Sequence, residues 1–361
     1  MSVSPLVTFV VPCYKLAHLL PQCVNSILGQ DFQDFEILIM DNCSPDDTPL
    51  VAQSFKDPRV KHIRSESNLG HVRNFNKGLT LASGKYVWLV SADDMLRSPR
   101  SLGRYVEAME RDPRVGFVYC RAVELREGKE AGIAQWTDSG DQDRIRDDTS
   151  FFIRLIEFNC ISMSSVMIRK QCLEKTSLFP LDLLFASDWH LWCMLALYFP
   201  VAYFAEPMVC CRFHEESLTS LYYQDHARIC IGDELTVLWR VGRQAELAGM
   251  LTQRDACDKA LVTRAVRRLE AGMKGDVPCM SEAEFEEILQ NRIPDVNSIR
   301  EIRAAVYTSL ADQLYSGGQY PQAAQSYRLG LSARPGRLKT WAKYLLLHTG
   351  ALGIRIRQLA D

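Results

Sequence analysis

The stretch Ser83-Gly-Lys-Tyr-Val-Trp-Leu-Val-Ser-Ala-Asp-Asp94 decides the fold predicted for this chain. Its centre, Tyr86 to Val90, has the length and composition of a buried strand, and Asp93 and Asp94 follow directly after it. Paired carboxylates are costly unless a cation neutralises them, and a divalent ion that also binds diphosphate oxygens is a common solution. Taken alone, the pair is better explained by a solvated turn or a helix cap, so the rest of the chain has to decide.

The chain on either side of this strand alternates between short apolar runs and helical periodicity. Strands are predicted at 7–11, 35–40 and 60–63, and helices at 19–28, 48–55 and 74–82. This spacing indicates an α/β fold with a mostly parallel sheet and helices on both faces. Ligands bind beyond the carboxyl ends of such strands. We therefore expect one crevice to be formed by Pro12-Cys-Tyr14, Asp41-Asn-Cys-Ser44 and Ser91-Ala-Asp-Asp94.

After Asp94 the alternation becomes less regular. Helices are predicted at 101–110, 151–157 and from Ser187, and strands at 115–120, 164–169 and 208–213. Residues 127–149 are charged and show no period, so we expect a mobile or substrate-binding loop. Pro200 interrupts the longest apolar run, 191–205, which is shorter than the ~20 residues that span a bilayer. We expect this run to be a helix end followed by a strand.

From about Asp225 onward the sequence is almost wholly helical, which predicts a domain at 1–224 and a helical domain at 225–361. Helical periodicity is clear at 235–247 and 256–273, and 304–331 has the spacing of a helix hairpin. The hairpin resembles a single tetratricopeptide-type unit; because a solenoid needs about three repeats, we expect an appendage. Roles considered for this tail are acceptor recognition, homodimerisation and, through the apolar and basic stretch 345–357, peripheral membrane contact, with ordinary helix packing as the alternative.

Composition excludes several functional classes. The 361 residues are 47% hydrophobic and carry a net charge of −2, which argues against nucleic-acid binding and for a small-molecule substrate. None of the twelve cysteines forms a CxxC pair, and most lie in apolar runs. We therefore expect reduced, buried cysteines and no zinc site. No signal peptide is recognisable, so we expect a cytoplasmic protein, with the inner membrane face as a peripheral location.

Four further positions have both a functional and a structural interpretation. Asp41 ends a strand, where it suits either a nucleotide base edge or a plain turn. Asp188 begins a helix in Phe185-Ala-Ser-Asp-Trp-His-Leu-Trp192, where it suits a general base or a helix cap. His214, two residues after Arg212, suits a metal or diphosphate contact or a structural histidine. Arg73 suits a phosphate contact or an exposed surface position.

The order of the motifs favours the functional interpretations. They are Pro12-x-Tyr14, Asp41-x-x-Ser44, Asn68-Leu-Gly70, Asn74-Phe-Asn-Lys-Gly78, Ala82-Ser-Gly-Lys-Tyr86 with the acidic pair, Ser187-Asp-Trp-His-Leu-Trp192 and Cys211-Arg-x-His-x-x-Ser-Leu-Thr219. Each motif is short, but their combination over residues 5–222 is specific. This part of the chain resembles the family 2 glycosyltransferases, which have the nucleotide-diphospho-sugar transferase (GT-A) fold.

The resemblance implies a role for each matched position. The catalytic base of the family matches Asp188. The metal and ribose motif matches Ser91 to Asp94, so Mn²⁺ or Mg²⁺ is expected at Asp94, Asp93 and His214. Contacts with the nucleotide are expected from residues at strand ends and at a helix start, namely Pro12, Tyr14, Asp41, Asn42, Arg73, Asp93 and Arg212.

The sequence also departs from the family pattern. Ser91 and Ser187 stand where the family often has acids. Asn42 and Cys43 replace the second acid and the glycine of a common Asp-Asp-Gly-Ser turn. Further changes are Cys13 for Thr, Lys15 for Asn and Phe75 for an arginine, which leaves Arg73 as a displaced substitute. The departures bear on nucleotide identity and metal geometry rather than on the fold.

The implied activity is inverting, metal-dependent transfer of a sugar from a nucleotide-diphosphate donor, most simply a UDP-sugar. The expected acceptor is a hydroxyl of a glycan or lipid-linked glycan in bacterial-type surface polysaccharide or glycoconjugate assembly. One alternative is a sugar nucleotidyltransferase, but Val10 to Leu16 lacks the glycines typical of that class. A second is a catalytically decayed carbohydrate- or partner-binding protein. No GxGxxG follows a strand, which argues against an NAD-dependent dehydrogenase.

Overall fold

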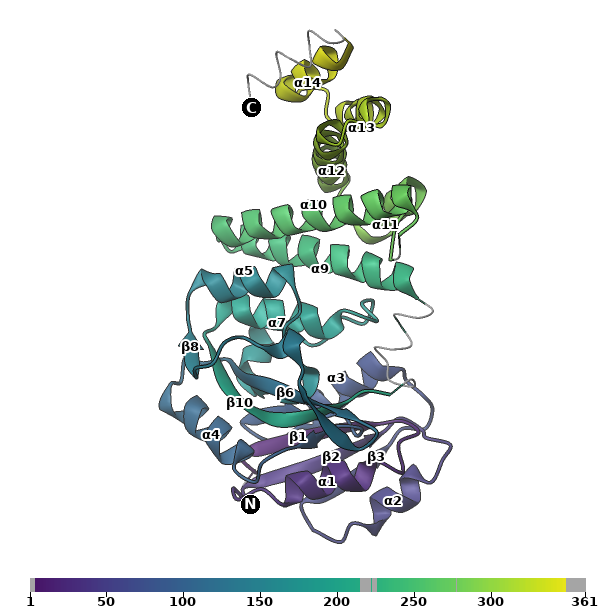
Figure 1. Ribbon diagram of the computed structural model, residues 1–361. Coiled ribbons are helices and arrows are strands. Elements are labelled where there is room, and N and C mark those ends of the chain that lie inside the picture. Colours follow the sequence, from purple (N-terminus) through teal and green to yellow (C-terminus); the bar gives the residue numbers. More distant parts are fainter. Residues whose placement is uncertain (1–3, 215–221, 223–225, 277, 349–361) are drawn as a thin grey trace. The chain divides into compact units, whose positions relative to one another are not determined.

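The computed structural model describes residues 4–214, 222, 226–276 and 278–348 (Figure 1). The chain forms two compact units, Met1–Asp225 and His226–Asp361. The first contains a sheet with helices packed against it, and the second is helical. None of the helices in the described part combines the length and hydropathy that crossing a bilayer requires.

The first half of the sheet is parallel, as expected. Its strands lie in the order β3-β2-β1-β4 and are β1 (Val7–Cys13), β2 (Phe35–Asp41), β3 (Val60–Arg64) and β4 (Tyr86–Leu89). Every residue of β1 and β2 is buried, because parallel strands are covered on both faces. The carboxyl ends of these neighbouring strands therefore share one edge.

The second half of the sheet is mixed. It continues from β4 through β9 (Met167–Arg169), β6 (Phe117–Arg126) and β10 (Val201–Arg212) to β5 (Met95–Leu96). β9 runs antiparallel to both of its neighbours, whereas β10 is parallel to β6. The strand predicted at 208–213 is the end of this longer β10, whose register against β6 shifts between Phe204 and Val209. The strand predicted at 164–169 corresponds to β9, which is shorter than predicted because residues 163–165 form a 3₁₀ turn.

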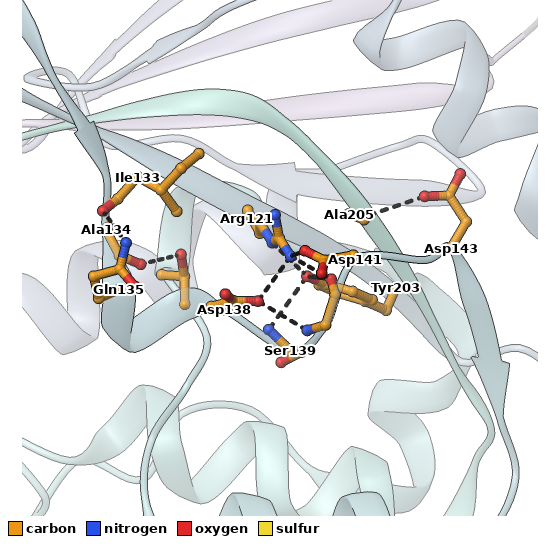
Figure 2. Close-up of polar contacts among 12 residues, drawn as sticks. Arg121, Ile133, Ala134, Gln135, Asp138, Ser139, Asp141, Asp143, Tyr203 and Ala205 are labelled. Carbon is orange, nitrogen blue, oxygen red and sulfur yellow. Dashed lines mark hydrogen bonds and ion pairs between the residues drawn. The ribbon is translucent and has the colours of Figure 1, made fainter.

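The segment 127–149, expected to be a mobile or substrate-binding loop, contains two short strands that pair with the sheet. β7 (Lys129–Ile133) pairs with β6, and β8 (Arg144–Arg146) pairs with β10. Asp138 and Asp141 lie in the segment between these two strands. The guanidinium of Arg121, a β6 residue whose side chain is 13% exposed, lies 2.9 Å from Asp138 and 2.5 Å from Asp141 (Figure 2). Tyr203 donates its hydroxyl to the carbonyl of Gly140 at 2.8 Å. Backbone pairing and these polar contacts fix the segment, and neither produces a hydrophobic period.

Seven helices are described in the first unit, namely α1 (Leu20–Leu28), α2 (Thr48–Ser54), α3 (His71–Leu81), α4 (Ser101–Arg111), α5 (Thr149–Glu157), α6 (Leu173–Thr176) and α7 (Ser187–Tyr198). α3 begins three residues before the predicted start. It packs so closely on β1 that a Cβ on Gly78 would lie 2.3 Å from Val10. Only glycine therefore fits at this helix position.

An aromatic stack forms the centre of the core. Trp88 of β4 stacks on Phe9 at 5.4 Å between ring centroids and on Tyr105 at 4.3 Å, and Tyr105 stacks on Phe204 at 5.5 Å. The indole N–H of Trp88 donates to the carbonyl of Ser164 at 2.8 Å. The core thus fixes the segment before β9, next to the end of β4.

The second unit consists of helices in its described part. These are α9 (Ala227–Leu247), α10 (Leu251–Lys274), α11 (Glu282–Arg292), α12 (Val296–Ser316), α13 (Tyr320–Ala333) and α14 (Leu338–His348). The hairpin predicted at 304–331 corresponds to α12 and α13, although α12 starts earlier. α11, which was not predicted, begins with a capping box between Ser281 and Glu284. Most of the predicted stretch 345–357, from residue 349 onward, lies outside the described residues.

Candidate active site

Asp41 ends β2 with its side chain completely buried. Its Oδ2 lies 2.7 Å from Nη1 of Arg64 and 3.3 Å from Nε2 of His62, and its Oδ1 accepts the backbone N–H of Ser44 at 2.8 Å. Burial alone raises the pKa of this carboxyl, but the hydrogen bonds from Ser44, His62 and Arg64 outweigh burial and lower it. Asp41 is therefore a charged anchor at the ends of β2 and β3, and its contact with a base remains a prediction.

Asn42 connects this edge to the loop before α3. Its Nδ2 donates to Oδ1 of Asn68 at 2.9 Å, and its Oδ1 accepts the backbone N–H of Leu69 at 2.8 Å. The next residue, Cys43, has φ of 60°, the left-handed conformation that favours glycine. The backbone of the turn is thus the one that a glycine would adopt, although the residue is not a glycine.

Pro12 and Tyr14 lie at the end of β1. The carbonyl of Pro12 accepts the backbone N–H of Ala92 at 3.2 Å, which joins β1 to the turn that carries the acidic pair. The ring of Tyr14 is 39% exposed, and Nζ of Lys15 lies 5.3 Å from its centroid. An exposed ring beside a cation at this edge has the chemistry to contact a nucleotide.

The acidic pair is joined to the end of β10. Nε2 of His214 lies 3.0 Å from Oδ2 of Asp93. The backbone N–H of Arg212 donates to Oδ1 of Asp94 at 2.8 Å, and its Nε donates to the carbonyl of Asp93 at 2.9 Å. Four of the predicted site residues, widely separated in sequence, therefore meet at one place.

Ser164 completes the environment of Asp94 and was not predicted. Its hydroxyl donates to Oδ2 of Asp94 at 2.5 Å and accepts the backbone N–H of Ser91 at 3.1 Å. Burial, followed by the charge of Asp93, raises the pKa of Asp94 to about 7. At neutral pH this carboxyl is therefore divided between its charged and neutral forms, a state that a nearby cation would shift toward the charged form.

Asp188 lies in the first turn of α7 and is partly buried. Its Oδ1 accepts the backbone N–H of Trp189 at 2.6 Å, and its Oδ2 accepts from Nδ2 of Asn159 at 3.3 Å. Burial raises the pKa of Asp188 to about 6, although both hydrogen bonds oppose the rise. A carboxylate with this pKa is ionised at neutral pH and is a stronger base than an ordinary aspartate.

One short segment connects Asp188 with the acidic pair. Asn159 contacts Asp188, and Ser164, five residues later, contacts Asp94. Five residues span at most about 18 Å even when fully extended. The hydroxyl of Ser162 lies 2.8 Å from Sγ of Cys211, which fixes the segment to β10. The sequence contained no signal for Asn159 or Ser164, because polar residues between two elements are normally turn residues.

Arg73 does not join this cluster. Because α3 begins at His71, Arg73 lies in the first turn of that helix and is exposed, and no side-chain partner is found for it among the described residues. Other residues of its motif fix the helix, since Nδ2 of Asn74 donates to the carbonyl of Met40 at 2.9 Å and Nδ2 of Asn76 to that of Phe179 at 2.8 Å. A phosphate contact by Arg73 remains a prediction.

The donor atoms at the acidic pair are compatible with a divalent ion of limited protein coordination. In the described part of the chain, no group of three or more His, Cys, Asp or Glu side chains is arranged to hold a metal. Asp93 and His214 form a close carboxylate–imidazole pair, and both oxygens of Asp94 accept hydrogen bonds. Mg²⁺ in proteins is often held by one or two carboxylates together with phosphate oxygens and water, which this set permits.

A model of one protein family matches part of the first unit. Residues 8–176 match the model of glycosyl transferase family 2. This match includes Asp41, the acidic pair, Asn159 and Ser164 and ends before Asp188.

Several similar curated proteins are named as bacterial glycosyltransferases. Glycosyltransferase GlyG of Streptococcus pneumoniae is 32% identical over 31% of this chain and 38% of its own length. An uncharacterised glycosyltransferase of Haemophilus influenzae is 26% identical over 62% of this chain and 70% of its own. The GalNAc(5)-diNAcBac-PP-undecaprenol beta-1,3-glucosyltransferase of Campylobacter jejuni is 37% identical over 26% of this chain and 31% of its own length. The chain therefore spans less than half of the length of GlyG and of the Campylobacter enzyme.

Among solved structures, residues 1–349 of S. aureus TarS in complex with UDP-GlcNAc are similar in fold. The TM-score is 0.63 with 18% sequence identity, and the match covers 91% of this chain and 92% of the TarS chain. At this identity the similarity shows the fold alone. It agrees with the GT-A-like sheet and the helical C-terminal region described above.

Proposed function

We propose that the first unit transfers a sugar from a nucleotide-diphosphate donor to a hydroxyl of an acceptor glycan, with inversion at the anomeric carbon. The match of residues 8–176 to the model of glycosyl transferase family 2 supports this proposal. The observation that carries the proposal is the cluster of Asp93, Asp94, Arg212 and His214, tied through the segment 159–164 to Asp188. A diphosphate site and a base are the two parts that this reaction requires.

A UDP-sugar is the proposed donor, and a glycan or lipid-linked glycan in bacterial polysaccharide assembly is the proposed acceptor. The Campylobacter relative is named for a lipid-linked acceptor, and TarS was solved with UDP-GlcNAc. Tyr14 and Asn42 lie at the strand edge where a nucleotide would bind.

Asp93, Asp94 and His214 are the residues proposed to hold Mn²⁺ or Mg²⁺. A bound divalent ion would stabilise the negative charge that develops on the leaving diphosphate. Arg212 adds a second positive charge beside the pair, because its Nε already donates to the carbonyl of Asp93. Ser164 and the backbone of Arg212 orient the carboxylate of Asp94.

Asp188 is the proposed general base. It removes the proton of the acceptor hydroxyl as the oxygen attacks the anomeric carbon from the face opposite the diphosphate. Its raised pKa of about 6 suits this task, because the carboxylate is ionised at neutral pH yet accepts a proton more readily than an ordinary aspartate. Asn159 holds the carboxylate in place through its side-chain amide.

Exchange of Asp188 for asparagine tests the proposal. Asp188→Asn should bind UDP as the wild type does but lose transfer by about 10²–10⁴-fold, the usual contribution of general acid–base catalysis. Wild-type kcat/KM should rise with pH through an apparent pKa of about 6, because only the ionised carboxylate accepts a proton. Asp31→Asn, at an exposed aspartate, is the control. Unchanged turnover in Asp188→Asn would exclude Asp188 as the base.

A further inference from the structure

A cleft of about 300 Å³ lies within the second unit, among α9, α10, α12 and the residues after α13. This volume is at the lower end of the range for small-molecule sites, ~300–1,000 Å³. Its charged lining consists of four arginines and three carboxylates, namely Arg243, Arg254, Arg334, Arg337, Glu246, Asp258 and Glu301. The lining therefore has a formal charge of +1, in a chain whose net charge is −2.

Three of the arginines pair with carboxylates of the same cleft. The pairs are Arg243–Glu246, Arg254–Asp258 at 3.2 Å and Arg334–Glu301 at 2.8 Å. At least one member of every pair is about half exposed, so solvent screens these interactions and they are weak. A ligand oxyanion can therefore compete with the carboxylates for the guanidinium groups.

Arg337 differs from the other three arginines. It is partly buried in the wall of the cleft, and within the described part of the chain no carboxylate or other side chain is found as its partner. A guanidinium group offers five N–H donors in a fork that matches phosphate and carboxylate oxygens. An anion can therefore bind Arg337 without breaking an ion pair within the described part of the chain.

Two further residues of the lining favour an anion with an apolar or saccharide body. Burial raises the pKa of Asp258, although Arg254 opposes the rise, so this acid repels an anion less than an ordinary carboxylate would. Trp239 contributes an aromatic side chain to the wall. Its indole N–H is buried and has no hydrogen-bond acceptor among the described residues, which leaves a donor for a ligand to satisfy.

We propose that this cleft binds the phosphate or carboxylate group of a negatively charged glycan, and that the glycan is the acceptor chain of the transfer reaction. The identification of the ligand as an acceptor rests on the proposed function, whereas anion binding by the second unit does not. The arginines bind the charged group, and Trp239 packs against the sugar. The helical unit thereby selects charged over neutral glycans.

Calorimetric titration of the full chain tests the proposal. The probes are glucose 6-phosphate, glucuronate and, as a neutral control, glucose, each titrated with UDP already present so that a nucleotide site is occupied. The two charged sugars distinguish phosphate from carboxylate as the preferred group. At least one of the two charged sugars should bind to the protein, and glucose should not.

Three variants locate the binding. Arg337→Gln should weaken binding of the charged sugar about tenfold, as expected for the loss of a charged hydrogen bond. Arg328→Gln is the matched control, because Arg328 is an exposed arginine of α13 outside the cleft, and it should bind as the wild type does. Glu301→Gln should strengthen binding, because it releases Arg334 from its carboxylate.

The outcomes separate this proposal from the proposed function. Equal binding of charged and neutral sugars, or equal losses in Arg337→Gln and Arg328→Gln, would overturn anion binding by the cleft. Failure of UDP itself to bind would contradict the proposed donor but would leave the sugar titrations interpretable. Sugar binding that persists unchanged in all three variants would assign it to a different surface.

Discussion

At the scale of single residues, Ser164 has the most specific role outside the predicted set. It lies 70 positions from Asp94 in sequence, yet its hydroxyl is 2.5 Å from Oδ2 of that residue. The hydrogen bond stabilises the charged form of a carboxyl whose pKa is raised to about 7 by burial and by Asp93. Ser164 is a positioning residue, since it acts on the proposed metal site through Asp94.

Ser164→Ala should therefore raise the pKa of Asp94 further and weaken Mn²⁺ binding at pH 7 by about ten- to hundredfold, the effect expected for one hydrogen bond to a charged group. The loss should diminish at a pH well above the raised pKa, where Asp94 is charged in both proteins. Mn²⁺ titration followed by electron paramagnetic resonance, with UDP present, measures the affinity.

Ser165→Ala is the matched control, because Ser165 is equally buried but donates its hydroxyl to the carbonyl of Ser162. Equal Mn²⁺ affinities of the two variants at pH 7 would contradict the role given to Ser164.

The sequence predicted that Asp93, Asp94, Arg212 and His214 belong to one site, and the structure brings these four together. The sequence allowed this prediction because strand ends and family motifs mark those four positions. Ser164 and Asn159 were missed, since their contacts depend on where the segment before β9 packs in three dimensions. Arg73 was assigned to the site by its position in a motif, and the structure leaves it exposed beside the helix start.

At the scale of elements, the close approach of β1 to the turn before β4 leaves no room at Gly84. A Cβ there would lie 2.7 Å from the backbone nitrogen of Thr8 and 2.8 Å from the carbonyl oxygen of Tyr86. Backbone atoms of a central strand cannot move without breaking the ladder. The glycine of the Ala82-Ser-Gly-Lys-Tyr86 motif is therefore required for packing.

Gly84→Ala should lower the free energy of unfolding by about 1–3 kcal/mol or more, the usual cost of overpacking. Gly103→Ala is the control, since a Cβ in this helical position of α4 meets only Phe32 at 3.9 Å. It should stabilise the protein by about 0.5–1 kcal/mol. Urea denaturation measures both values, and equal effects of the two substitutions would contradict the packing argument.

Strands and helices with a clear period were predicted well, as in β1, β2, α1 and α4. Elements that are held by edge pairing or by buried charge were not predicted from the sequence. β7 and β8 lie in a charged segment without a period, and β5 has only two residues. A bend in β10, where its register shifts, made one strand look like two in sequence.

At the scale of the whole molecule, Asp188 links stability to pH. Its pKa is raised from an ordinary value of 3.8 to about 6 in the folded protein. Between these two values the folded state binds more protons than the unfolded state, so the free energy of unfolding falls as the pH rises. Above about pH 6 Asp188 is charged in both states, and its full destabilising contribution to the folded state is present.

Asp188→Asn removes this contribution and should raise the free energy of unfolding by about 1–3 kcal/mol at pH 8, where wild-type Asp188 is charged. Near pH 4 the two proteins should be equally stable, because the wild-type carboxyl is then protonated in the folded state. Asp31→Asn, at an exposed aspartate, is again the control. Denaturation at both pH values decides, and a pH-independent difference would contradict the linkage.

The exposure of the cysteines allows each unit to be labelled at one position. All twelve are free thiols; ten are buried, Cys43 is partly exposed at the end of β2, and Cys279 is exposed before α11. A maleimide dye should therefore react with Cys279 first, and Cys279→Ser should direct it to Cys43. The chain thus carries one natural attachment point for a fluorophore in each unit, and a dye at Cys43 would lie beside the proposed nucleotide site.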